Sequence, residues 1–586
     1  MFVYRLRDIR IDACNKKTMV IKDKNIKLTY SNIILLNILM IALFLRIWGI
    51  WNVSTTDEYN EVIEALRVCS GHFNFERWMK RFYLYILSIE YSIYYVIGWV
   101  FNVFHNPMDF AAKIVRNMEP LFIIGRATSA IAGACTVGVL YKIGETFYNK
   151  KVAVVSSVLL AFTLFHIDLS QQAKVDAILG LLVVSAFYFI LRILEIHIAN
   201  KWDYLWCGLL TALAIQTKIN SIVLFVPLCL TFCFGFKNKQ IILRYIFVFF
   251  IPAFIAGFVI GNPPVLFAPI KFIKGALGLG SVYSTAVNVV PNDLIGFFAY
   301  PLYYCRNMGI VVSIFTVFAI IYAILNLNKR RAVLISFIAC FYILMGASKN
   351  LVADYYMIPA MPFIYLLFGD FMSETSDKLS STIPLFRGKS MIMLILIMLF
   401  GLIEPAINVA KHEISLTGKN TRYIAKTWIE KNIPAGSKIL MDSGKSINSF
   451  APPIAENKKS LERILLHARE NVSKGKIVHA MVDNNALIYY ELLLKTAPEK
   501  SYDITSTMFG LDVNPINYYI SNQYQYLIIS KDMKNSRTNE FFAKRNPEIA
   551  GFYKSLNTDK RIKLVKTIFP TPMNGGDTFY IYEVMR

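Results

Sequence analysis

The sequence predicts a polytopic α-helical membrane protein that carries a soluble α/β domain at its C-terminal end. Hydrophobic residues make up 55% of the 586 residues, charged residues make up 17%, and the mean hydropathy is +0.46. Soluble domains hold about 45–50% apolar and about 25% charged residues. Apolar windows recur from residue 33 to about 410, each long enough to cross a hydrocarbon core of ~30 Å. Because a spanning segment must satisfy its own backbone hydrogen bonds, we expect these windows to be helices.

About eleven spanning helices are expected. They lie near residues 33–51, 120–141, 152–168, 177–196, 204–217, 221–236, 241–262, 309–327, 332–347, 355–373 and 391–409. The window 83–104 is also apolar, but it is rich in Tyr and Trp and contains Glu90. Such rings favour the membrane interface, so we expect this window to lie at the outer surface as a juxtamembrane helix.

The charge distribution predicts the orientation of the chain. The net charge is +23, and Lys and Arg crowd residues 1–32 and short loops such as 328–331. This bias is typical of cytoplasmic segments, and no motif for nucleic-acid binding accompanies it. We therefore expect a basic cytoplasmic N-terminus (1–32), a transmembrane domain (33–410) and an extracytoplasmic α/β domain (411–586). The expected location is the plasma (inner) membrane, crossed several times.

The C-terminal region reads as a small α/β domain. Residues 421–444 predict a helix followed by a short strand at 439–441, and further strands are predicted at 526–530, 562–569 and 579–584. None of the eight cysteines lies after residue 410, and none forms a CxxC pair. A disulfide scaffold or zinc site is therefore not expected, and neither a metal nor a cofactor is predicted.

Four carboxylates follow the first apolar window, in "WNVSTTDEYNEVIEALRVCSG" (51–71). Thr55 and Glu58 match a capping box, which predicts a helix that starts at about Asp57. One face of that helix would carry Asp57, Glu61 and Glu64, and another would carry Val62, Ala65, Leu66 and Cys69. The pattern indicates an interfacial helix whose carboxylates face water or a cleft. They either cap and solvate the helix or take part in chemistry.

The segment 55–74 ("TTDEYNEVIEALRVCSGHFN") and the segment 121–162 resemble the opening of the GT-C membrane glycosyltransferases. The similarity is to glycosyltransferase family 39, which holds the protein O-mannosyltransferases and the aminoarabinose transferase of lipid A. Family members have an acidic residue in the first external loop and a Gly-Arg pair at the second span, here Gly125–Arg126. A second acidic residue follows the third span, here Asp176. "TKIN" (217–220), "GNPP" (261–264) and 348–362 also resemble family segments.

The resemblance implies an inverting transfer of a sugar from a polyprenyl-phosphate donor to a hydroxyl acceptor on a lipid, a glycan or a protein. Such a transfer needs a carboxylate that takes the acceptor's proton, and cations where phosphate charge develops. Asp57 is the expected catalytic carboxylate, Glu58 is its neighbour, and Asp176 is the second candidate. Asp176 would otherwise pair with Lys174 or cap its helix. The candidate phosphate ligands are Lys349, Lys80, Arg81, Arg126 and Lys218, and each has a structural alternative as a snorkelling cation.

A transporter or flippase of lipid-linked sugars is the main alternative function. Transporters place ionisable groups near the bilayer midplane and often contain inverted repeats. Here the acidic residues gather at the expected external ends of the helices, and no internal repeat is visible. A receptor-like role for residues 411–586 also stays open. The glycine-rich stretch 275–281 lacks the features of a nucleotide loop and is expected to act as a lid over the donor site.

Overall fold

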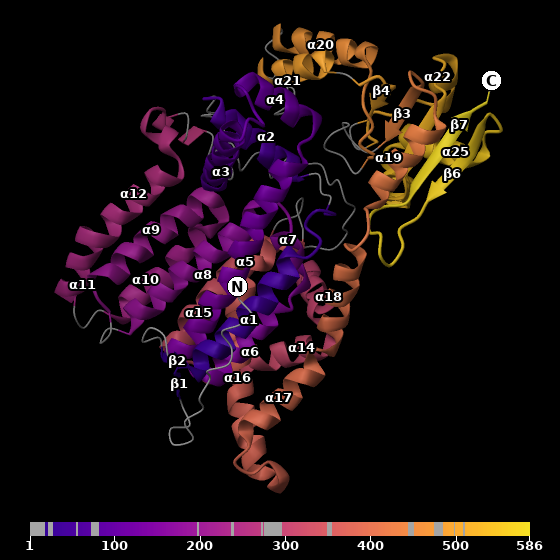
Figure 1. Cartoon of the computed structure of the whole chain (residues 1–586). Helices are drawn as coiled ribbons and strands as arrows, with labels where there is room; N and C mark the ends of the chain where they lie inside the picture. Colours follow the sequence, from indigo (N-terminus) through magenta and orange to yellow (C-terminus); the bar gives the residue numbers. More distant parts are fainter. Residues whose placement is uncertain are drawn as a thin grey trace.

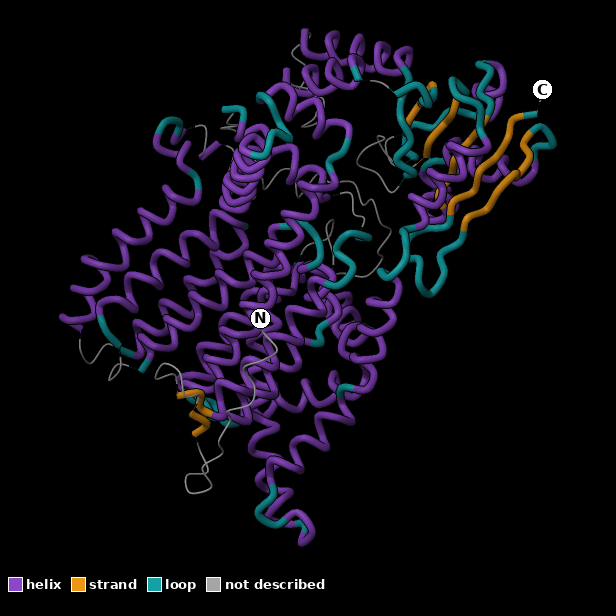
Figure 2. The backbone as a smooth tube through the Cα atoms, viewed as in Figure 1, coloured by secondary structure: helices purple, strands orange, loops and turns teal. Residues whose placement is uncertain are grey.

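The chain folds into a helical bundle with a mixed β-sheet at one end (Figures 1 and 2). The computed structural model describes residues 18–20, 27–53, 57–71, 81–195, 199–235, 239–270, 273–274, 296–347, 354–442, 451–473, 484–496, 498–507 and 510–585. Two short antiparallel strands, β1 (Thr18–Val20) and β2 (Lys27–Thr29), precede the first helix. They lie at the end of the bundle that is farther from the large sheet (Figure 1).

Apolar helices build the bundle, and every window expected to span the membrane contains helix. The bundle elements are α1 (Tyr30–Ile47), α5 (Glu119–Phe147), α6 (Lys150–Ala161), α7 (Leu164–Ser170), α8 (Val175–Leu194), α9 (Lys201–Thr217), η1 (Ile219–Leu224), α10 (Phe225–Phe234), α11 (Lys239–Tyr245), η3 (Ile246–Phe250), α12 (Ile251–Gly261), η4 (Pro263–Leu266), α14 (Gly296–Leu325), α15 (Lys329–Gly346), η5 (Asp354–Ala360), α16 (Met361–Thr382), η6 (Pro384–Phe386), α17 (Ser390–Gly401) and α18 (Ile403–Ser415).

Five of these helices, within the described residues, are long and apolar enough to cross a membrane. The number rises to seven if two bent pairs each count as one span: α6 with α7, bent by 61°, and α17 with α18, bent by 51°. The expected number of eleven is therefore not confirmed. Several expected spans, such as α1 and the η1–α10 segment, are shorter than a bilayer-crossing helix, and composition alone could not reveal the bends.

One helix of the bundle starts earlier than expected. A spanning helix was expected at 309–327, but α14 already begins at Gly296 and bends at Gly309, where φ is 75°. Only a residue without Cβ adopts this backbone conformation readily. The Glu404 carboxylate on α18 accepts the backbone N–H of Ile310 at 3.0 Å, directly after the bend. Residues 275–281, the expected lid, lie outside the described residues.

The basic loops come together at one end of the bundle. Arg330 donates to the Glu195 carboxylate at 2.6 Å and to the Phe147 carbonyl. These two hydrogen bonds connect the loops that follow α5, α8 and α14. Arg331 pairs with Asp370 on α16 at 2.8 Å. This clustering is what a shared cytoplasmic side requires, and the sidedness itself stays a prediction.

Three helices gather at the opposite end, the end that also carries the large sheet (Figure 1): α2 (Asp57–Cys69), α3 (Arg81–Val100) and α4 (Pro107–Arg116). Helix α2 starts at Asp57, as the capping pattern predicts, and it buries Val62 and Ala65 against α3. The window 83–104 is a helix as expected, and its place at the interface stays a prediction. Asn106 caps α4 by accepting the Asp109 N–H at 2.9 Å.

The C-terminal sheet has five strands in the order β4-β3-β5-β7-β6. The first three strands, β4 (Asp503–Ser506), β3 (Lys438–Asp442) and β5 (Tyr526–Ser530), are parallel. β7 (Phe579–Val584) runs antiparallel to β5 and pairs with β6 (Ile562–Ile568). The predicted strands are confirmed, whereas β4 was not foreseen, since "DITS" is short and polar. The predicted helix after residue 420 is α19 (Thr421–Asn432).

Helices cover both faces of this sheet. On one face, Ile439, Met441 and Ile528 pack with Ala425 and Ile429 of α19. The other face packs on α22 (Ile516–Ser521) and α25 (Pro547–Thr558). The remaining helices of this region are α20 (Lys458–Ser473), α21 (Asn484–Lys495), α23 (Lys531–Thr538) and α24 (Glu540–Arg545). Helix α21 contacts α4, so this region also touches the juxtamembrane helices.

Candidate active site

Glu58 and Arg126 form a buried ion pair where α2 meets α5. Arg126 donates through Nε and Nη2 to the two oxygens of Glu58, at 2.8 and 2.9 Å, and the two side chains are 3% and 1% exposed. The guanidinium also donates to the carbonyls of Ile50 and Val53 and to Glu119 Oε1. These contacts use all five N–H donors of an arginine.

Glu58 additionally holds the turn between α7 and α8. Its Oε1 accepts the backbone N–H of Ala173 at 2.7 Å. A Cβ at Gly125 would lie 2.8 Å from the Ala173 Cβ, so this close approach requires glycine. The Gly-Arg pair of the sequence therefore has a structural explanation: Gly125 admits the turn, and Arg126 ties it to α2 through Glu58.

This geometry gives structural roles to two residues that the sequence analysis placed among the candidate site residues. Arg126 was a candidate phosphate ligand and Glu58 a catalytic carboxylate, but their hydrogen-bonding groups are occupied inside the protein. Thr55, the other residue of the expected capping box, lies outside the described residues. Glu61 was expected to face water or a cleft and is 2% exposed. Glu64 pairs with Arg67 along the helix at 2.8 Å.

A second ion pair lies at the same end of the bundle. Asp176 is in the first turn of α8, and its Oδ1 accepts from Lys218 Nζ at 2.8 Å. Lys218 ends α9 and remains 16% exposed, whereas the Asp176 side chain is 7% exposed. The expected alternative partner Lys174 is not the residue that pairs with Asp176 here.

Two tyrosines cover this second pair. The Lys218 ammonium lies 4.8 Å from the ring centre of Tyr356 and 5.5 Å from that of Tyr355. Lys174 lies 5.4 Å from the ring of Tyr355. An ammonium within about 6 Å of an aromatic face is attracted to the ring. Both tyrosines therefore contact the candidate phosphate-binding cation Lys218.

Polar side chains that the sequence analysis did not single out lie around the end of α9. Gln216 is fully buried, and both atoms of its amide lack a hydrogen-bond partner within the described structure. Asn220 Oδ1 is buried and unpartnered in the same sense. Asn262 follows α12 and accepts from the Tyr85 hydroxyl at 3.5 Å. Asn220 lies in the quoted segment "TKIN", Asn262 lies in "GNPP", and Gln216 directly precedes "TKIN", so these segments were the available signal.

The remaining predicted site residues fall where side chains are not described. Asp57 and Arg81 are the first residues of α2 and α3, but their side chains lie outside the described part of the structure. Lys80 and Lys349 lie outside it entirely. The backbone of Asp57 is adjacent to Glu58, which bonds to Ala173 three residues before Asp176. Asp57 and Asp176 therefore belong to the same end of the bundle. Among the described residues, no three His, Cys, Asp or Glu side chains are grouped to hold a metal ion.

One hydrogen-bonded chain connects the C-terminal region to this end. The Tyr423 hydroxyl of α19 donates to Glu119 Oε2 at 3.3 Å, and Glu119 Oε1 accepts from Arg126 at 3.1 Å. A movement of α19 would therefore act on the Arg126–Glu58 pair and on the turn that leads to Asp176.

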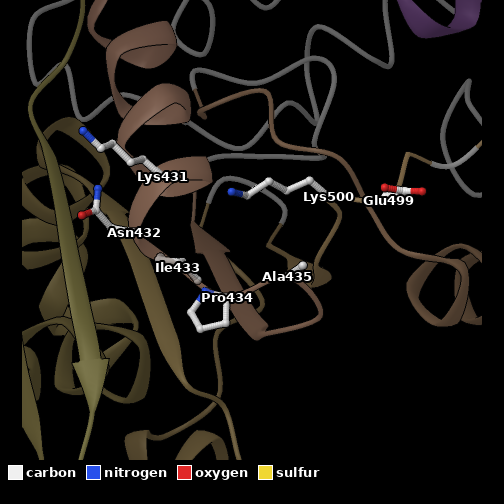
Figure 3. A pocket seen from close by; sticks show the side chains of 7 residues that line it. All are labelled: Lys431, Asn432, Ile433, Pro434, Ala435, Glu499 and Lys500. Atoms are coloured by element: carbon white, nitrogen blue, oxygen red, sulfur yellow. The ribbon is translucent and has the colours of Figure 1, made fainter.

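A solvent-open hollow of about 460 Å³ lies elsewhere, at the amino ends of strands β3 and β4 (Figure 3). The residues that line it are Lys431, Asn432, Ile433, Pro434, Ala435, Glu499 and Lys500. None of the predicted site residues lines it, and we assign it no part in the chemistry.

A family model described as dolichyl-phosphate-mannose-protein mannosyltransferase matches residues 121–267. This stretch is about a quarter of the chain and contains Arg126, Asp176 and Lys218. The match confirms the resemblance to the GT-C membrane glycosyltransferases over these residues. No curated protein gives a significant match.

Solved structures of two glycosyltransferases are similar in outline. One is the oligosaccharyltransferase of Archaeoglobus fulgidus, solved with a tethered acceptor peptide, which is 12% identical to this chain in sequence. The TM-score is 0.47, and the alignment covers 94% of this chain and 74% of the other. The other is ArnT from Cupriavidus metallidurans bound to undecaprenyl phosphate, which is 11% identical, with a TM-score of 0.47. That alignment covers 94% of this chain and 97% of ArnT. With TM-scores below 0.5, these likenesses carry no argument about the donor or acceptor.

Proposed function

We propose that this protein is an inverting glycosyltransferase that moves a sugar from a polyprenyl phosphate to a hydroxyl acceptor at the outer face of the membrane. The observation that carries the proposal is the Asp176–Lys218 pair beneath Tyr355 and Tyr356, within the stretch that matches the mannosyltransferase family. Lys218 has a partner in Asp176 and still keeps some exposure to solvent.

The proposed role of Lys218 is to bind the phosphate of the donor. In the transition state the glycosidic bond to phosphate breaks, and negative charge grows on the leaving oxygens. A fixed ammonium stabilises that charge, and Asp176 holds the ammonium in place. Lys80, Arg81 and Lys349 remain candidates for further phosphate contacts. Arg126 is proposed instead to fix the architecture, because its donors are already used.

Asp57 is the proposed general base. The acceptor oxygen attacks the anomeric carbon, the bond to the phosphate oxygen breaks, and polyprenyl phosphate departs with the electron pair. The acceptor's proton passes to the Asp57 carboxylate, and the configuration at the anomeric carbon inverts. Because the leaving group is already a stable anion, no second acid is needed to protonate it. The sugar and the acceptor (lipid, glycan or protein) are outside this proposal.

A transfer assay tests the proposal. The full-length protein in nanodiscs is incubated with a radiolabelled polyprenyl-phosphate mannose and with lipid, glycan and peptide acceptors. We expect transfer by the wild type and a loss of about 10²-fold or more in Asp57→Asn, the range that general-base catalysis contributes. Glu64→Gln is the matched control, since it removes a carboxylate from the same helix without touching the proposed chemistry.

Two results would overturn the proposal. Full activity of Asp57→Asn would remove the general base. Movement of a fluorescent lipid-linked sugar across proteoliposome membranes, with no transfer to any of the acceptors, would favour the flippase alternative instead.

A further inference from the structure

The loop between β6 and β7 exposes large apolar side chains on a hydrogen-bonded turn. Residues 569–573 ("FPTPM") are all exposed, and Phe569 and Met573 are 63% and 56% exposed. Thr571 and Asn574 exchange backbone hydrogen bonds at 3.0 and 3.1 Å. The two prolines of the loop also have fixed φ angles. The apolar side chains are therefore presented on a preformed backbone, which loses little conformational entropy when it binds a partner.

Hydrogen bonds join this loop to the end of α18. The Gly575 N–H donates to the Ser415 carbonyl at 2.8 Å, and the Gly418 N–H donates to the Met573 carbonyl at 2.7 Å. The Thr421 N–H, at the start of α19, donates to the Gly575 carbonyl at 2.9 Å. Figure 1 shows the loop at the end of the sheet that faces the bundle. The loop thus lies where the chain passes from the bundle to the sheet.

An apolar stripe on α18 leads to the loop. Ile403, Ile407 and Ile414 are 54%, 48% and 48% exposed, and their spacing places them on one side of the helix. Helix α18 belongs to a bent pair that is long and apolar enough to cross a membrane. Apolar side chains that such a helix leaves uncovered contact lipid chains. Because Ile414 directly precedes Ser415, the stripe reaches the residue to which the loop is bonded.

The charges around the loop suit a lipid surface. Lys419, in the segment bonded to the loop, and Lys566, three residues before Phe569, are exposed. The nearest carboxylates along the chain, Glu413 and Asp577, are buried and partly buried. Cations close to a bilayer are attracted to its anionic head groups. Apolar side chains flanked by cations are typical of segments that lie in the interface between lipid and water.

We propose that the β6–β7 loop is a membrane anchor, in which Phe569 and Met573 enter the head-group layer on the side of the membrane that carries the sheet. Lys419 contacts lipid phosphates beside them. The partner is the bilayer surface, because the loop continues the stripe by which α18 faces lipid. The anchor holds the sheet against the membrane, and with it the contact between Tyr423 and Glu119. The proposal does not depend on the transferase chemistry, because the loop contains none of the residues assigned to it.

Photocrosslinking tests this proposal. The full-length protein is placed in nanodiscs of phosphatidylethanolamine and phosphatidylglycerol. The photoreactive amino acid p-benzoyl-phenylalanine replaces Phe569 in one variant and Met573 in another, so that the test does not rest on one substitution. After illumination, mass spectrometry of the denatured protein detects covalent lipid adducts. We expect lipid adducts at both positions, at a yield at least tenfold higher than at a matched control position.

The matched control position is Leu466 on α20. Its side chain is 62% exposed, as Phe569 is, but α20 lies at the far end of the molecule, beyond α4 and α21 (Figure 1). The same probe at Ile407 is the positive control for lipid contact of α18, and it should give adducts as well.

Three results would overturn the proposal. One is a lipid adduct at Ile407 with none at Phe569 or Met573. Another is a crosslink from these two loop positions to a second protein chain in place of lipid, which would make the loop an interface between copies. The third is the absence of lipid adducts at Ile407, which would remove the lipid-facing stripe. A protein without transferase activity would still give the expected adducts, since the test uses neither donor nor acceptor.

Discussion

Two ion pairs at the same end of the bundle differ in how completely their hydrogen bonds are satisfied. Glu58 and Arg126 are almost fully buried, and together they make bonds to Ile50, Val53, Glu119 and Ala173 besides their own. Asp176 and Lys218 share one hydrogen bond, and the lysine otherwise rests on aromatic rings. All five N–H donors of Arg126 are used inside the protein, whereas Lys218 uses one of the three donors of its ammonium in its bond to Asp176.

This contrast separates residues that the sequence placed in one group. Arg126 and Lys218 were both cations near span ends, and both were candidates for the phosphate. The two cations differ in how many of their N–H donors are already hydrogen-bonded within the protein. That number depends on contacts between residues far apart in the chain. The following predictions test the distinction, from the largest expected effect to the smallest.

Removal of one partner of the saturated pair should destabilise the protein most. Glu58→Gln removes the buried counter-charge of Arg126 and leaves only the more exposed Glu119 beside it. Breaking a buried pair costs about 3–5 kcal/mol. Unfolding in mixed detergent micelles measures this change. Asp176→Asn, the equivalent change in the other pair, should have a clearly smaller effect on stability. An equal loss in both variants would contradict the distinction.

Lys218→Gln should lower the rate of sugar transfer more than it lowers stability. Loss of a fixed group that stabilises developing charge lowers transfer by about 10²–10³-fold. Lys218→Arg should recover part of this loss, because the charge remains. Initial rates of sugar transfer measure both effects, and an unchanged rate in Lys218→Gln would place the phosphate elsewhere. The matched control is Lys142→Gln, an exposed lysine near the opposite end of α5.

Asp442, the fully buried last residue of β3, should make stability depend on pH. Burial raises its folded-state pKa from 3.8 to about 7, with partial offset from the Tyr553 and Thr507 hydrogen bonds. The folded state therefore holds a proton that the unfolded state releases, and stability falls as the pH rises from about 4 to about 7. Asp442→Asn should remove this fall in stability with rising pH, because the amide does not titrate.

We expect the variant to lose less stability than the wild type between pH 4 and pH 8, because it has no buried carboxyl group to ionise. The difference should shrink toward pH 4. Melting curves across this range measure it, and a difference that grows toward low pH would contradict the assigned sign.

Tyr423→Phe should have the smallest effect on stability. It removes one hydrogen bond to Glu119, which contributes about 0.5–1.5 kcal/mol. Because Glu119 also bonds to Arg126, transfer activity should fall modestly as well. Thr427→Ala, one helical turn further along α19, is the control, since its hydroxyl bonds only to the Tyr423 carbonyl. Equal activity of the two variants would show that α19 does not act on the membrane end.

Much of the fold could be predicted from the sequence. The apolar windows predicted the bundle helices, and the capping pattern predicted the start of α2 at Asp57. The β-branched and aromatic residues at 526–530 and 579–584 predicted β5 and β7 to the residue. These features depend on local periodicity, which one sequence contains. The bends between α6 and α7 and at Gly309 depend on neighbouring helices, and periodicity does not report them.

The site was predictable in part. The spacing of Asp176 and Lys218 within family-like segments singled out both residues, but not their contact with each other. The burial of Glu61, the saturation of Arg126 and the open amide of Gln216 were not predictable, because they follow from how α2, α5, α9 and α12 pack. The burial of Asp442 gave no signal either, since it follows from how α25 packs against the strands around β3.

The most direct test of the account is whether Lys218 holds a lipid phosphate. Native mass spectrometry of the purified protein with undecaprenyl phosphate measures the bound fraction without any need for a sugar or an acceptor. We predict that the wild type and Lys142→Gln retain the lipid, whereas folded Lys218→Gln loses most of it. Equal retention by Lys218→Gln, or no retention by the wild type, would contradict the account.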